Sequence, residues 1–180
     1  MAPYFFPPMW EQRRICIAHT LRKHCAHSVL EVGCGEGNVL SFLAAPTLDD
    51  HPITELYGIN INRSALLAAR DRLLPADYDC RDLRVDRFRI ELFHGNAAMP
   101  LASAEPDAMV CTEVIEHVDP KMVTLLTCVV LGAYCPRLAI FTTPNAEFNV
   151  NFPDLNYGKQ TARSRDPDHK FEWTRAQFFH

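Results

Sequence analysis

The sequence lacks the features that mark zinc-ribbon, membrane and secreted proteins. None of its seven cysteines lies in a C-x-x-C pair, which predicts reduced thiols and no cysteine zinc site. Its longest apolar stretch, Met122 to Tyr134, is shorter than the roughly 20 residues that cross a bilayer. No basic segment precedes an apolar core at the N-terminus, so no signal peptide is indicated. We therefore expect a cytoplasmic protein with no membrane partner.

The sequence also lacks an excess of positive charge. Its formal net charge of −4 argues against a broad surface that coats nucleic acid, because neutralising phosphates requires clustered Lys and Arg. An enzyme that handles only the end of a nucleic acid is compatible with this charge. Internal repeats are absent, and 180 residues with 48% hydrophobic and 22% charged content fit one globular domain.

Apolar segments alternate with helical patterns along most of the chain. The predicted strands are residues 28–32, 54–60, 89–94, 106–111 and 137–142. The predicted helices are residues 11–26, 38–45, 63–74 and 121–131. This βαβ alternation predicts an α/β fold with a doubly wound, mostly parallel sheet.

The alternation ends after Pro144. Residues 144–170 have no clear periodicity, and a loop of this length inside a compact domain is usually functional or disordered. Thr174 then has the character of an N-cap that begins one more helix. We expect the last strands of such a doubly wound fold to be missing from this chain.

A glycine-rich turn follows the first predicted strand. Glu31 lies near the end of the strand, and Gly33, Gly35 and Gly37 alternate after it. Glycine lets the backbone turn tightly and approach a ligand closely. The G-x-G-x-G spacing after an acid is typical of class I methyltransferases that bind S-adenosylmethionine (SAM), with Glu31 at the amino-acid end of the cofactor. A merely tight βα turn is the alternative.

Two asparagines follow the next strands. Asn60 occupies the place where a carboxylate usually pairs with the ribose hydroxyls. Its amide accepts a hydroxyl hydrogen bond without charge assistance, which predicts weaker cofactor binding. Asn96 follows the third strand, where a methyltransferase contacts the adenine.

A group of metal-ligating residue types follows the fourth strand. Glu113, Glu116 and His117 are spaced i, i+3 and i+4, so one helical turn would point them to the same side. Their convergence beside a cofactor predicts a divalent-metal site, and a solvated acidic turn is the alternative. His169, in the long loop, can return as a fourth ligand. Two Glu and two His suit Mn²⁺ or Co²⁺ at least as well as Mg²⁺.

Four segments carry a specific resemblance. Residues 5–13, 113–117, 143–149 and 168–175 resemble the small-RNA 3′-terminal 2′-O-methyltransferases, a family that includes plant microRNA and animal piRNA methyltransferases. The resemblance spans nearly the whole chain. The sequence departs from the family pattern at Met9, where Leu is usual, and at Asn60, where Asp is usual.

The resemblance implies a single class I (Rossmann-like) methyltransferase domain over residues 1–180. Residues 1–13 would form an N-terminal arm, and residues 144–170 a loop for metal and RNA. SAM would be one cofactor, bound by Glu31, Gly33, Gly35, Asn60 and Asn96. The other would be one divalent ion, Mg²⁺ or Mn²⁺, held by Glu113, Glu116, His117 and His169.

The expected reaction methylates the 2′-hydroxyl of the 3′-terminal nucleotide of a small RNA and so protects its end. His117, with Glu116 beside it, would take the hydroxyl proton. The expected partners are the RNA 3′ end and an Argonaute or Piwi-type protein that delivers it. Two alternatives are open: a bacterial-type RNA-repair methyltransferase, and a metal-binding scaffold with an inactive cofactor site.

Overall fold

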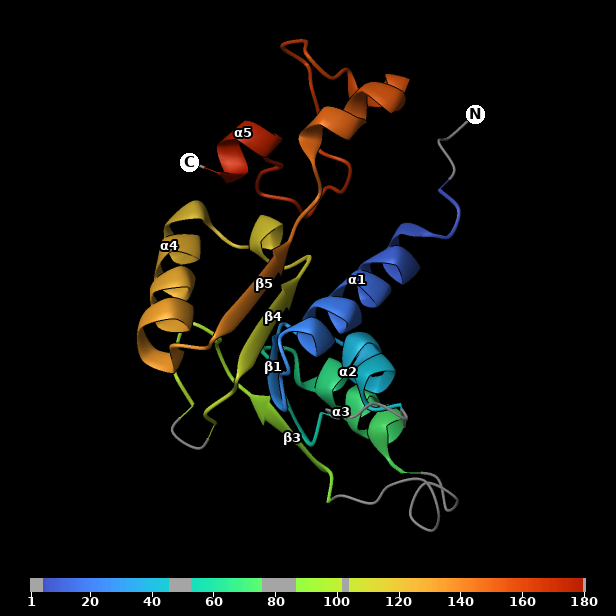
Figure 1. The fold of residues 1–180 in the computed structure, drawn as a ribbon. Coiled ribbons are helices and arrows are strands. Elements are labelled where there is room, and N and C mark those ends of the chain that lie inside the picture. Colours follow the sequence, from blue (N-terminus) through green and yellow to red (C-terminus); the bar gives the residue numbers. More distant parts are fainter. Residues whose placement is uncertain (1–4, 46–52, 76–86, 102–103, 180) are drawn as a thin grey trace.

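Five parallel strands form the centre of the computed structural model, which describes residues 5–45, 53–75, 87–101 and 104–179 (Figure 1). The start of the predicted N-terminal arm lies outside the described residues. The strands are β1 (Ser28–Val32), β2 (Glu55–Asn60), β3 (Arg89–His94), β4 (Ala108–Thr112) and β5 (Leu138–Thr142). Their order in the sheet is β3-β2-β1-β4-β5, and every pairing is parallel. The chain order therefore reverses between β1 and β4, and in open parallel sheets ligands bind outside the carboxyl ends of the strands at this point.

Helices cover both faces of the sheet. Figure 1 places α1 (Met9–Lys23), α2 (Asn38–Leu43) and α3 (Arg63–Leu73) on one side and α4 (Pro120–Cys128) on the other. The helix starts have local causes. Gly37 begins α2 in a left-handed conformation, while Asn62 and Asp119 cap α3 and α4 by accepting backbone N–H bonds.

Successive strand residues supply two separate cores. Val29, Leu56 and Val110 pack with Ile17 and Leu21 of α1 and with α2 and α3. Their neighbours on the opposite face, including Leu30, Tyr57 and Met109, pack with Leu126 of α4 and with Val130. This alternation is what a sheet covered on both faces requires. The predicted doubly wound α/β fold is confirmed.

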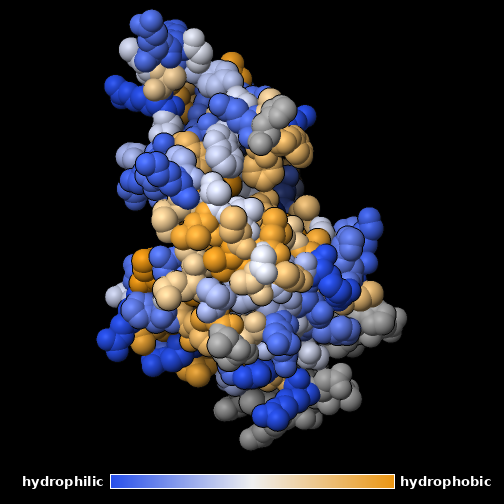
Figure 2. All heavy atoms as spheres, turned by 90° about the vertical axis from the view of Figure 1, so that its left-hand side faces the viewer, coloured by the Kyte–Doolittle hydropathy of each residue, from blue (hydrophilic) through white to orange (hydrophobic). Residues whose placement is uncertain are grey.

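The segment after α4 continues as a π-helix, η2 (Val129–Tyr134), before the chain enters β5. Figure 2 faces the side of the molecule where α4 lies and shows apolar side chains gathered across its middle. Leu125 and Leu131 are among the exposed apolar residues of α4 and η2. Within the described part of the chain, no helix is long and apolar enough to span a membrane.

The long segment after β5 lies beyond the carboxyl ends of the strands (Figure 1). It contains two 3-10 helices, η3 (Ala146–Asn151) and η4 (Pro153–Leu155), so the predicted loop has short local structure. Thr174 caps α5 (Arg175–Phe178) through a capping box with Gln177, which confirms the predicted N-cap. Asn145 and Trp173 form a parallel bridge, so the segment leaves the sheet and returns beside its own start.

Candidate functional site

The glycine turn after β1 has the backbone that the sequence predicts. Gly33 has φ +71°, and a Cβ built on it would meet Cγ2 of Val114 at 2.5 Å, so packing and conformation both require glycine there. Gly35 has φ +53°, and a Cβ on it would meet no atom of the described residues within 4 Å. The turn is fixed to β2 by the N–H of Gly33, which donates to the carbonyl of Ile59 at 2.9 Å. The backbone around Gly35 therefore faces open space suited to a ligand.

Glu31 is a buried acid with an unused oxygen. Glu31 is only 3% exposed, and its Oε2 has no hydrogen-bond partner among the described residues. Burial raises the pKa of Glu31 from 4.5 to about 8, while the N–H of Leu40 and the charge of Arg14 act in the lowering direction. An unpaired buried carboxylate oxygen needs a donor. The ammonium group at the amino-acid end of SAM is such a donor, so the site fits the cofactor.

Asn60 and Asn96 hold the turns after β2 and β3. The side-chain oxygen of Asn60 accepts from the N–H of Asn62 at 2.7 Å, and that of Asn96 accepts from the N–H of Ala98 at 2.9 Å. Each oxygen thus has a local partner, and one lone pair is left on each for a ligand. Both residues lie at the carboxyl edge of the sheet, on the β2 and β3 side of the glycine turn. Their predicted contacts with ribose and adenine stay predictions.

A second group lies on the β4 side of the same edge. Ligand atoms of Glu116, His117 and His169 all lie within 4.8 Å of one another. Glu116 is fully buried; its Oε2 accepts from the hydroxyl of Thr143 at 3.2 Å, and its Oε1 has no partner among the described residues. Burial, and then the neighbouring Glu113, raise the pKa of Glu116. A buried carboxylate with an unpaired oxygen beside two imidazoles fits a divalent cation, and imidazole favours the softer first-row ions over Mg²⁺.

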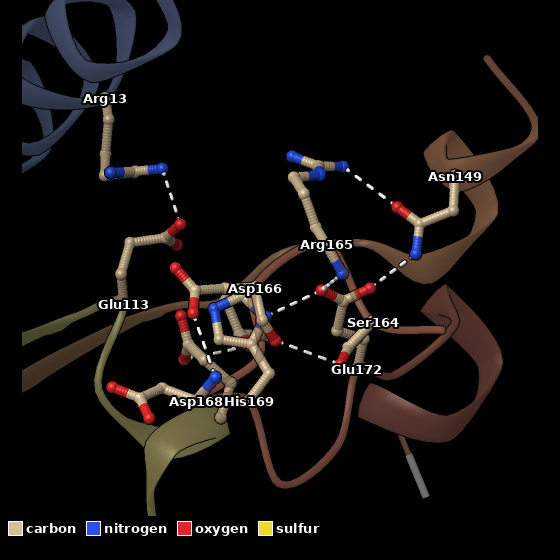
Figure 3. Close-up of polar contacts among 11 residues, drawn as sticks. Arg13, Glu113, Asn149, Ser164, Arg165, Asp166, Asp168, His169 and Glu172 are labelled. Carbon is tan, nitrogen blue, oxygen red and sulfur yellow. Dashed lines mark hydrogen bonds and ion pairs between the residues drawn. The ribbon is translucent and has the colours of Figure 1, made fainter. Parts of the chain in front are cut away.

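Glu113, the remaining predicted ligand, points elsewhere. Its Oε2 lies 2.8 Å from a guanidinium nitrogen of Arg13 (Figure 3). Its Oε1 accepts from the hydroxyl of Thr142 at 3.2 Å. The expectation that one helical turn carries Glu113, Glu116 and His117 is wrong. The 3-10 helix η1 spans only Ile115–His117, and Glu113 precedes it with a left-handed φ of +52°. Its role as a ligand stays a prediction.

His169 reaches this group because the segment after β5 folds back. The N–H of Lys170 donates to the carbonyl of Glu116 at 2.7 Å, which fixes the returning chain against η1. The rings of His117 and His169 meet edge to face, with centroids 4.9 Å apart. The predicted return of His169 to the other two residues is therefore confirmed.

One polar residue beside this group was not singled out from the sequence. Glu172 lies 2.6 Å from Nδ1 of His169. Burial raises the pKa of Glu172. The hydrogen bonds that its carboxylate accepts from Asn149, from His169 and from the N–H of Arg165 lower the pKa by more than burial raises it, so the net shift is downward. The i, i+3 spacing from His169 was the available signal, and it is too common to be informative alone.

Comparison with known proteins supports the family resemblance stated from the sequence. Residues 30–131 match the family model described as "Methyltransferase domain". The chain is 33% identical over 181 residues to a small RNA 2′-O-methyltransferase of Schizosaccharomyces pombe, covering 97% of this chain and 48% of that protein. It is 32% identical over 176 residues to the protein of the same name from Mus musculus, covering 97% of this chain and 42% of that protein. The chain thus spans less than half the length of these two relatives.

Solved structures give a consistent result. The crystal structure of the small RNA methyltransferase HEN1 superposes with a TM-score of 0.83 at 30% identity, covering 99% of this chain and 21% of that one. The methyltransferase domain of the bacterial CtHen1-CN superposes with a TM-score of 0.72 at 31% identity, covering 94% of this chain and 79% of that one. The resemblance inferred from the four sequence segments is confirmed by these similarities.

Proposed function

Because the chain belongs to the methyltransferase domain family, we propose that it transfers a methyl group from SAM to the 2′-hydroxyl at the 3′ end of a small RNA. The observation that carries this proposal is the convergence of Glu116, His117 and His169 at the sheet edge that also carries the glycine turn. The names of the relatives support the substrate class.

The cofactor would lie across the turn after β1. Glu31 would accept from its ammonium group, and the backbone of Gly33 and Gly35 would lie against it. Asn60 and Asn96 would contact the ribose and the adenine. In this arrangement the chain's residues hold the donor methyl group in a fixed direction, which lowers the entropic part of the barrier.

The divalent ion, Mg²⁺ or Mn²⁺, would be held by Glu116, His117 and His169, with Glu113 as the fourth ligand once it leaves Arg13. A bound divalent ion lowers the pKa of a hydroxyl that it coordinates and so makes a poor nucleophile reactive at neutral pH. Two open positions would suit the two free oxygens of a terminal ribose. The ion site would therefore also select RNA with an unblocked 3′ end.

The hydroxyl proton would pass to His117, with Glu116 beside it. His117 is the exposed member of the group, so a substrate oxygen can reach it, whereas Glu116 is fully buried. Ligation and proton uptake use the same lone pair of an imidazole nitrogen. His117 would accordingly act as the base when it is not a ligand.

The proposed RNA would reach the site with help from an Argonaute or Piwi-type protein. The likeness to a bacterial Hen1 domain favours a second candidate within the same chemistry, an RNA-repair methyltransferase that acts on cleaved RNA ends. A scaffold with an inactive cofactor site is the third candidate, motivated by Asn60 in place of a carboxylate.

Two measurements separate these candidates. Calorimetry with SAM should give measurable binding, and no binding would favour the scaffold. Labelled SAM should then methylate small RNAs with a free 3′ end and leave blocked ends unmodified. Methylation of cleaved RNA fragments in preference to small RNAs would instead support the repair role.

A further inference from the structure

Glu172 and His169 form a buried pair beside the candidate metal group. Nδ1 of His169 lies 2.6 Å from Oε1 of Glu172, and the two side chains are only 8% and 3% exposed. With Nδ1 engaged in this way, Nε2 is the ring nitrogen left for the side of Glu116 and His117. The pair therefore determines which ring nitrogen of His169 is directed toward the other two ligands.

The carboxylate of Glu172 is itself held from several directions. Oε1 also accepts from the N–H of Arg165 at 2.7 Å, and Oε2 accepts from the side-chain amide of Asn149. A guanidinium nitrogen of Arg165 donates to the side-chain oxygen of Asn149 at 3.2 Å, which closes the network (Figure 3). The guanidinium also lies over the ring of Phe152, 5.1 Å from its centroid. Residues of η3 and of the chain before His169 thus fix the position of this one carboxylate.

The other acids of the segment lack such a setting. Glu147, Asp154, Asp166 and Asp168 are exposed. Asp166 accepts from the N–H of Asp168 at 2.9 Å within its own turn, and neither it nor Asp154 contacts an imidazole among the described residues. If Glu172 only stabilised the loop, its carboxylate would not need to face a buried imidazole. The geometry of Glu172 is that of a residue that orients a histidine ligand.

We propose that Glu172 is the positioning residue for His169, accepting the Nδ1–H bond so that Nε2 faces the ion and making that nitrogen a better donor through its negative charge. The inference rests on the proposed metal-dependent function, since it assumes that His169 is a ligand. It adds a residue outside the four predicted ligands. The network with Asn149 and Arg165 sets the direction of His169 before any ion binds.

The first test uses the unmodified chain without metal. In ¹⁵N NMR spectra of the neutral imidazole, His169 should carry its proton on Nδ1 and have an unprotonated Nε2. His169→Gln identifies the signal by its disappearance. A proton on Nε2 would overturn the proposal without any variant of Glu172.

The second test measures Mn²⁺ binding by electron paramagnetic resonance or calorimetry. Glu172→Gln should weaken Mn²⁺ binding by roughly 10- to 100-fold and leave SAM binding unchanged. Asp154→Asn removes the same charge from an exposed position of the segment and should leave both affinities at their starting values. Unchanged Mn²⁺ affinity in Glu172→Gln would overturn the proposal.

A double variant tests whether Glu172→Gln weakens Mn²⁺ binding only because the loop loses its structure. In Asn149→Asp combined with Glu172→Gln, the new carboxylate accepts from the new amide and from Arg165, while the glutamine oxygen still accepts from His169. The loop and the tautomer should be restored, yet Mn²⁺ binding should stay several-fold weaker because the charge no longer touches His169. Full recovery of Mn²⁺ affinity would show a bracing role only and overturn the charge effect.

His169→Ala separates this inference from the proposed function. Reduced Mn²⁺ affinity in His169→Ala with parental affinity in Glu172→Gln would overturn the positioning role alone. Parental affinity in both variants would overturn the ligand role of His169 and with it the proposed four-ligand site.

Discussion

Glu31 shows how one residue can lower the stability of the folded chain and still suit a ligand. Its pKa is raised from 4.5 to about 8, so the folded chain binds a proton that the unfolded chain releases above pH 4.5. The stability that this proton contributes is complete below pH 4.5 and is lost as the pH rises through about 8. Above that pH the buried carboxylate lowers the stability of the folded chain relative to a neutral side chain.

We predict that Glu31→Gln removes this pH dependence. Without SAM, the parent should lose up to about 4–5 kcal/mol of unfolding free energy between pH 4.5 and 8 through this group, and the variant should not. Urea unfolding at several pH values measures the difference. Glu105→Gln, an exposed control, should follow the parent. Parallel curves for parent and Glu31→Gln would contradict the burial of an ionisable Glu31.

We predict that Asn60→Asp tightens SAM binding. One carboxylate oxygen can keep the bond from the N–H of Asn62, and the other is free for a ribose hydroxyl with charge assistance. The gain should be on the order of 1 kcal/mol, or several-fold in Kd, and repulsion from Glu31 offsets part of it. Titration calorimetry measures the change, with Asn156→Asp as a control in the segment after β5. Binding no tighter than that of the parent would mean that Asn60 does not face the ribose.

At the scale of elements, α1 meets the loop after β4 through one ion pair. Arg13 and Glu113 are each partly exposed, at 24% and 28%, and lie 2.8 Å apart. Such a pair contributes little to stability, because solvent screens it. Its consequence is positional, since it holds the carboxylate of Glu113 against Arg13 and outside the group of Glu116, His117 and His169.

We predict that Arg13→Gln tightens Mn²⁺ binding several-fold if Glu113 is the fourth ligand. The arginine competes with the ion for the same carboxylate, and the glutamine does so without charge. Lys23→Gln, at the other end of α1, is the matched control for lost charge and should bind Mn²⁺ like the parent. An unchanged affinity in Arg13→Gln would argue that Glu113 is not a ligand.

The elements of the sheet were predictable because their causes are local or periodic. The strands predicted at 28–32 and 89–94 match β1 and β3, and the predicted helix at 63–74 ends within one residue of α3. The predicted helix at 121–131 covers most of α4 and the start of the segment that follows it. The π-helical geometry of Val129–Tyr134 and its end at Tyr134 were not predicted, since they leave no signal in the apolar pattern. The helix predicted at 11–26 is observed as α1, which begins two residues earlier than predicted and ends at Lys23.

The site was predictable only in part, because much of it depends on distant contacts. The glycine turn and the Glu116–His117 pair are local in sequence, and His169 was predicted from its place in the long loop and from the resemblance. The Arg13–Glu113 pair joins residues 100 positions apart, and the Asn149–Glu172 bond joins residues 23 positions apart. Glu113 also has a positive φ, which a glutamate rarely adopts, and no sequence pattern indicates it. The prediction of one helical turn over Glu113, Glu116 and His117 was wrong for this reason.

At the scale of the whole molecule, the sheet brings the two halves of the proposed reaction to one edge. The glycine turn follows β1, the Glu116 group follows β4, and these neighbouring strands flank the point where the chain order reverses. The returning segment from β5 then closes one side with His169. The proposed methyl donor and the proposed terminal ribose would therefore meet at this one edge of the sheet.

We predict that the substrate is recognised through both terminal hydroxyls. An RNA with a 3′-deoxy or a 3′-phosphate end should be methylated poorly, because it cannot offer two hydroxyl oxygens to the ion held by Glu116, His117 and His169. A 2′-deoxy end should accept no methyl group, since the acceptor oxygen is absent. Rates with labelled SAM on four otherwise identical RNAs measure this. The SAM affinity of the chain is the internal control, because the chemistry of the RNA end does not alter the residues proposed to bind the cofactor. Equal rates on 3′-hydroxyl and 3′-deoxy ends would rule out chelation and leave the ion with a role at the 2′-oxygen alone.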